Sequence, residues 1–144
     1  MKEILATIHR FAAQPFEWGR RDCALLPADW FLHVHGIDPA AHLREAYHDL
    51  ASCHRATGWF TDPVGVVEGC LQTVRQEPGA YPRDPATLSV GDVGVLAIPL
   101  GRRAFPAGGV WLGHAWAFRA EAGVTTRHPA TLSVLATWGI GYAA

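Results

Sequence analysis

The division of the chain into a helical first half and a strand-rich second half most constrains its fold. Up to about residue 75, apolar residues recur at the spacing of amphipathic helices, punctuated by Asp, Pro and Gly. Residues 76–92, QEPGAYPRDPATLSVGD, form a Pro- and Gly-rich connection, after which the pattern becomes that of strands. Helices followed by strands predict an α+β domain with helices packed on a C-terminal antiparallel sheet, rather than an alternating, doubly wound fold.

Asp residues mark the expected helix starts, and Gly residues mark several of the ends. Two of these Asp residues precede a Pro, which suits the first helical position. The expected helices are residues 2–12, residues 22–36 with Asp22 as N-cap, residues 38–50, a short piece up to residue 56, and residues 64–75.

The second half is expected to form short strands joined by tight turns. The expected strands are residues 93–98, 110–119, 124–128 and 138–142. Alternation along residues 110–119 places His114 on one face with Leu112, Trp116 and Phe118. Residues 102–109, RRAFPAGG, are expected to be a loop or hairpin tip, residues 121–123 a turn, and residues 129–136 one helical turn.

Length and composition favour a single globular domain, residues 1–144, with a core that needs no disulfide. The net charge of −1 gives no electrostatic footprint for nucleic acid or an anionic membrane. No apolar segment is long enough to predict a membrane span, and the N-terminus does not resemble a secretory signal. The three cysteines and eight histidines have no metal-site spacing, so neither a metal nor another cofactor is expected.

The stretch PFEWGRRDCALL, residues 15–26, places Cys23 directly after an acid at the expected start of a helix. Helix N-terminal amides and nearby cations favour a thiolate, so Cys23 is a candidate nucleophile. His114 is a candidate base and His128 a candidate for orienting that base, because neighbouring antiparallel strands can bring both to one edge. The alternative is that Cys23 is a buried structural thiol.

The segments PFEWGRRDCALLPADW, SVGDVGVLA and GHAWAF…GVTTRHP resemble, in this order, the NlpC-type cell-wall cysteine peptidases, especially the short versions of phage tails and gene-transfer particles. The resemblance implies a papain-like fold with Cys23 as nucleophile, His114 as base and His128 as its orienting residue. It also implies a substrate site that Asp22 lines and that includes the position of Phe16. Trp18 is expected as a groove wall, and Arg21 either binds carboxylates of an acidic peptide or is solvated.

Two hypotheses for function follow from the resemblance. The first is a cysteine peptidase that cleaves an amide of the peptidoglycan stem peptide. It would belong to a tail tip, bound to tail hub proteins, made in the host cytoplasm and carried to the envelope by the virion. The second is a structural tail-tip or tail-assembly subunit with the same fold and little or no activity. Phe16, where the family has a tyrosine, and Ala24-Leu25, where it has Ser-Gly, favour the second. A thiol-dependent acyltransferase is a more distant third.

Overall fold

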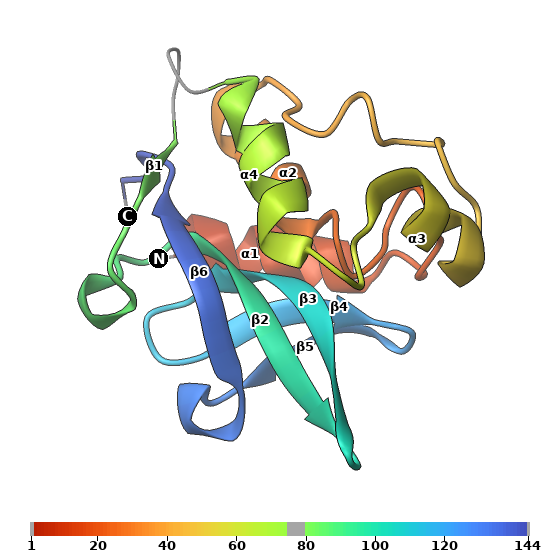
Figure 1. Ribbon diagram of the computed structural model, residues 1–144. Coiled ribbons are helices and arrows are strands. Elements are labelled where there is room, and N and C mark those ends of the chain that lie inside the picture. Colours follow the sequence, from red (N-terminus) through yellow and green to blue (C-terminus); the bar gives the residue numbers. More distant parts are fainter. Residues whose placement is uncertain (1, 75–79, 144) are drawn as a thin grey trace.

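The computed structural model describes residues 2–74 and 80–143 and shows four helices on one side of a curved six-stranded sheet (Figure 1). The helices are α1 (Lys2–Ala12), α2 (Leu26–His35), α3 (Leu50–Thr57) and α4 (Pro63–Gln72). The strands are β1 (Tyr81–Pro82), β2 (Val93–Leu100), β3 (Arg103–Trp111), β4 (Trp116–Ala120), β5 (Gly123–Arg127) and β6 (Ser133–Gly139). The predicted α+β class with an antiparallel sheet is confirmed.

The sheet has the strand order β1-β6-β2-β3-β4-β5, and every neighbouring pair is antiparallel. Strands β2 to β5 form three successive hairpins, and β6 returns to pair with β2 on the other side. Helix α2 packs on β3 and helix α1 on β5. The turn that precedes α2 therefore lies over the middle of the sheet.

Most expected helix boundaries are confirmed. Helix α1 spans the predicted residues 2–12. Gly36 and Gly58 end α2 and α3 in the left-handed conformation, at φ 74° and 73°. The Asp62 carboxylate caps α4 by accepting a hydrogen bond from the Gly65 amide. Helix α4 ends at Gln72, earlier than predicted, and Arg75, its expected last residue, lies outside the described residues.

The prediction that Asp22 is the N-cap of the second helix is wrong. Helix α2 begins at Leu26, and its N-cap Leu25 makes no capping side-chain hydrogen bond. The Asp22 carboxylate instead accepts hydrogen bonds within the preceding loop and from Tyr47. The Asp22 side chain therefore binds tertiary partners instead of the N-terminal amides of α2, which the local sequence pattern had predicted.

The expected helix over residues 38–50 is also wrong, because residues 39–45 form turns. The Asp38 carboxylate does accept the Ala40 amide, as a start signal should, but it also binds the Arg44 side chain. Glu45 adopts φ 59°, and its amide donates to Gly19 O at 2.8 Å. A left-handed residue ends helical geometry, so docking of this segment on the residue 19 loop overrides its helix signals.

Several predictions for the second half of the chain need correction. Most of residues 102–109, expected as a loop, belongs to β3, whose hairpin with β2 turns at residues 101–102. Residues 110–119, expected as one strand, are divided between β3 and β4 by a turn at residues 112–115 that contains His114. The last strand, β6, runs over Ser133–Gly139 and overlaps the strand expected at residues 138–142 only at its end. Of residues 129–136, expected as one helical turn, only Pro129–Thr131 form a short 3₁₀ turn, and the strand β6 begins directly after it. The turn expected at residues 121–123 is confirmed between β4 and β5.

The turn before α2 lies directly against β3. The Gly108 amide donates to Cys23 O at 2.7 Å, joining the helical layer to the sheet. A Cβ atom at Gly108 would lie 2.5 Å from Cδ of Pro27 and 3.2 Å from the Ala24 carbonyl oxygen. Only glycine allows this close approach, which fixes the position of Cys23 over the sheet.

We expect Gly108→Ala to lower the free energy of unfolding by about 1–3 kcal/mol, because the added methyl group overpacks this crossing. Gly69→Ala is the matched control, since Gly69 is exposed on α4 with nothing near its Cβ position. A helical Gly→Ala change of this kind stabilises by up to about 1 kcal/mol. Urea unfolding of both variants is the measurement, and an undiminished stability of Gly108→Ala would contradict the close crossing.

Candidate active site

Cys23 lies in a cavity of about 510 Å³ between the turn before α2, the segment around α3 and the sheet. This volume suits a small molecule or a peptide side chain. Only 6% of the Cys23 surface is exposed. The lining is mostly apolar and consists of Phe16, Trp18, Cys23, Leu50, Phe60, Leu100, Phe105, Arg119, Ala120, Glu121 and Ala122.

Two of the predicted substrate-binding residues, Phe16 and Trp18, are brought together with Cys23 in this cavity. Their rings meet edge to face at a centroid distance of 5.1 Å, and Trp18 also packs against Phe60 at 6.4 Å. Edge-to-face aromatic pairs hold each other in place, so one wall of the cavity is a preformed aromatic surface.

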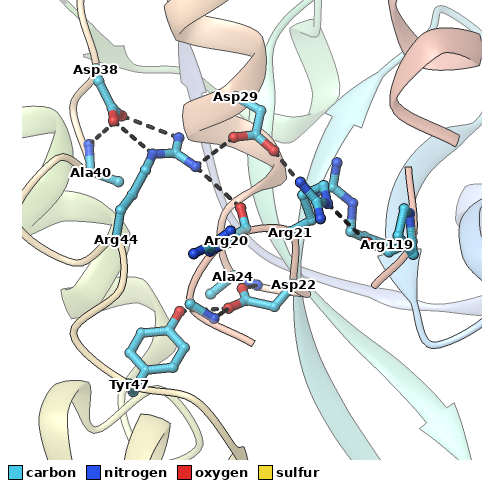
Figure 2. A network of polar contacts seen from close by, with 12 residues as sticks. Arg20, Arg21, Asp22, Ala24, Asp29, Asp38, Ala40, Arg44, Tyr47 and Arg119 are labelled. Atoms are coloured by element: carbon cyan, nitrogen blue, oxygen red, sulfur yellow. Dashed lines mark hydrogen bonds and ion pairs between the residues drawn. The ribbon is translucent and has the colours of Figure 1, made fainter. Parts of the chain in front are cut away.

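The predicted contact of Asp22 with substrate is not supported, because Asp22 is fully buried and does not line the cavity. Its carboxylate accepts the amides of Gly19 and Ala24, both at 2.9 Å, and the Tyr47 hydroxyl at 2.7 Å. Figure 2 shows Tyr47 and Ala24 converging on this carboxylate. Asp22 is therefore a structural residue that shapes the loop leading to Cys23.

Arg21 is half-buried and is bound to its own loop rather than to the cavity. Its Nε donates to the Pro15 carbonyl at 3.0 Å, and its Nη2 pairs with Glu17 at 2.8 Å. These contacts occupy the guanidinium that was a candidate for binding an acidic peptide.

The environment of Cys23 opposes a thiolate. Burial, followed by the negative charge of Asp22, raises the pKa of the Cys23 thiol from about 9 to about 12. The nearby Cys53 thiol acts in the same direction. The Trp59 indole, whose Nε1 is buried without a conventional hydrogen-bond partner, lowers the pKa but does not compensate. Cys23 is thus a protonated thiol at neutral pH.

The structure places His114 and His128 at one end of the β4–β5 hairpin and Cys23 at the other. Trp116 pairs with Arg127, so His114 and His128 both lie just beyond this pair. The Cys23 contact with β3 is at Gly108, whereas the cavity includes the turn at residues 120–122. Gly108 and Trp111 are roughly 10 Å apart along β3, and His114 lies farther along the chain.

The histidines thus share one edge, as expected, but they do not meet the thiol. Both are exposed, and Nδ1 of His128 accepts the Ala130 amide. The structure describes all eight histidines, and none lines the cavity. The β3 residues that pass Cys23 are Ala107, Gly108 and Gly109, which carry no acid–base group.

A charged network that was not predicted from the sequence links Asp29, Arg44 and Arg119 (Figure 2). It reaches the cavity at Arg119, which is one of the lining residues. Asp29 of α2 pairs with Arg119 Nη1 at 2.9 Å and with Arg44 at 2.8 Å, and Arg44 also pairs with Asp38 at 2.6 Å. Arg119 is completely buried. The one available signal was an arginine inside WAFRA, an otherwise apolar strand.

Over residues 2–74 and 80–143, no group of three His, Cys, Asp or Glu side chains is arranged to bind a metal ion. All three cysteines are free and buried. None of the described helices has the length and apolar character required to cross a membrane.

These features define a class: an α+β domain in which a buried cysteine and an apolar cavity lie between helices and an antiparallel sheet. The chain belongs to the family described as a domain of unknown function, DUF6950, which matches residues 1–140. No curated protein and no solved structure matches the chain.

We expect the Cys23 thiol to be alkylated by iodoacetamide far more slowly at pH 7–9 than the same thiol in urea-unfolded protein, because the thiolate is the reactive form. The rate is read from the Cys23 peptide by mass spectrometry. The raised pKa of Cys23 also makes the fold less stable as pH rises from about 9 toward 12, because in this range only the unfolded chain releases the thiol proton. Alkylation at pH 7 faster than in the unfolded protein would show an activated thiol.

We expect Tyr47→Phe to lower the free energy of unfolding by about 1.5–3 kcal/mol, because it removes a buried hydrogen bond to the Asp22 carboxylate. Tyr81→Phe is the matched control, since its hydroxyl is on the exposed strand β1 and contacts Arg83. That change should stay within about 0.5 kcal/mol of wild type. Equal effects of the two substitutions in urea unfolding would mean that the hydrogen bond to Asp22 contributes no more to stability than that of an exposed tyrosine hydroxyl.

Proposed function

We propose that this chain is a papain-like domain that binds cell-wall peptides as a non-catalytic subunit of a phage or phage-like tail tip. One observation carries the proposal: Cys23 lies in an apolar cavity, but no histidine lines this cavity and the thiol is held protonated. Cysteine catalysis requires a base within hydrogen-bond reach of the sulfur. The geometry thus supports the binding function better than turnover.

The binding function rests on the cavity itself. Phe16, Trp18 and Phe60 supply a fixed aromatic wall, and Leu50, Leu100 and Phe105 supply further apolar surface. Preformed aromatic surfaces bind peptides at a low cost in side-chain entropy. The resemblance to NlpC-type tail proteins suggests the cell-wall peptide as the ligand and the tail as the location. In the tail, a subunit of this kind would be bound to a hub protein.

Hydrolysis of a stem-peptide amide is the second candidate, and the position of Cys23 in the cavity favours it. Such a reaction needs a base other than His114, because His114 lies at the opposite end of β4. The His54 ring lies 6.1 Å from the ring of Phe60, a lining residue, although His54 does not itself line the cavity. His54 is the residue to test if any turnover is found.

One experiment separates the two candidates. Purified wild type, Cys23→Ala and Trp18→Ala are incubated with peptidoglycan sacculi, and both the retained protein and the newly released amino termini are measured. We expect wild type and Cys23→Ala to be retained equally with no new amino termini, and Trp18→Ala to lose at least tenfold in retention. Trp111→Ala is the matched control, because Trp111 is half-buried at the far end of β3 and does not line the cavity.

Release of amino termini by wild type but not by Cys23→Ala would establish the peptidase instead, and His54→Ala would then test the base. Equal retention of all four proteins would place peptide binding elsewhere than the cavity. Incorporation of tagged protein into tail particles, measured separately, tests the location.

A further inference from the structure

Among the described residues that line the Cys23 cavity, Arg119 is the one charged side chain that is completely buried. Its Nη1 donates to Asp29 at 2.9 Å, and the Phe11 ring lies 6.0 Å from its Cζ. Its Nε and Nη2 are buried and have no hydrogen-bond or ion-pair partner among the described residues. Buried donors are normally paired, so two vacant donors on one guanidinium require an explanation.

The two unpartnered nitrogens form one edge of the guanidinium. Nε–H and one Nη2–H point in the same direction, and their spacing matches the two oxygens of a carboxylate. Asp29, by contrast, holds the guanidinium from the Nη1 side and fixes its orientation. Asp29 is itself held by Arg44, which Asp38 anchors in turn. Arg119 is therefore held rigidly, and its two-pronged donor edge has no partner among the described residues. Because this edge is buried in the ligand-free structure, a bound carboxylate has to displace the side chains that cover it.

We propose that Arg119 binds the carboxylate of a ligand whose apolar part fills the Cys23 cavity, the best fit being the C-terminal residue of a peptide with an apolar side chain. This inference rests on the proposed peptide-binding function and names the chemistry that the cavity recognises. The aromatic wall of Phe16, Trp18 and Phe60 receives the apolar group, and the guanidinium edge receives the charge. Glu121, an exposed acid that also lines the cavity, disfavours a second carboxylate there.

The test compares two probes that differ only in charge, N-acetyl-L-leucine and N-acetyl-L-leucinamide, on the intact wild-type protein. Binding is followed by the Arg119 Nε–Hε resonance in ¹⁵N-edited NMR and by Trp18 fluorescence. We expect the acid to bind at least tenfold more tightly than the amide and to shift the Arg119 resonance. Octanoate is the third probe. A tenfold preference for N-acetyl-leucine assigns the carboxylate to a peptide terminus, whereas a preference for octanoate assigns it to a free aliphatic acid.

Arg119→Lys keeps the charge but cannot present two parallel donors, so we expect it to lose most of the preference for acid over amide. Equal binding of acid and amide to wild type, or an unshifted Arg119 resonance, overturns the carboxylate site. Binding of neither probe overturns it as well. Because retention on sacculi is measured independently of these probes, a failed carboxylate site remains distinguishable from a failed peptide-binding function.

Discussion

The buried carboxylate of Asp22 is the interaction on which the rest of the site depends. It gathers the Gly19 and Ala24 amides and the Tyr47 hydroxyl, so that the loop before α2 and the segment before α3 meet at one anion. Gly19 makes this junction possible, because at φ 83° a Cβ atom there would lie 2.2 Å from the Tyr47 carbonyl oxygen. Buried charge is tolerated where several donors replace water. Here those donors come from two segments and fix the floor beneath Cys23.

The same carboxylate that builds the site also works against cysteine chemistry. A negative charge in the residue before Cys23 opposes a second negative charge on the sulfur, and burial adds to this effect. A papain-like enzyme would need a cation beside the sulfur to reverse the balance. The β3 residues at this crossing are small and apolar, which allows the close contact with Cys23 but provides no imidazole. Close packing and acid–base catalysis therefore compete for the same position.

The α+β class, most helix boundaries and the cavity residues Phe16, Trp18 and Cys23 could be predicted from sequence, because periodicity and punctuation are local signals. The failures were at places where distant partners decided the conformation. Asp22 binds Tyr47 and the loop amides instead of capping the expected helix. The segment around Glu45 docks on Gly19, and this contact prevents the helix that was predicted there. The split between β3 and β4 moved His114 away from Cys23, since a turn replaced a continuous strand. Pairing of Asp29 with Arg119, 90 residues later, left no local pattern at all.

Stability alone does not account for an arginine at position 119. Replacing a buried ion pair by well-packed apolar residues is often neutral or stabilising, because desolvation offsets much of the Coulomb attraction. Here only one of the three guanidinium nitrogens has a partner among the described residues, so the balance is less favourable than for a fully bonded pair. A ligand carboxylate would complete the donor set in a cavity whose other walls are apolar. The proposed carboxylate site accounts for the incomplete pairing of Arg119, and under that proposal the specificity of the cavity depends on β4 rather than on the thiol.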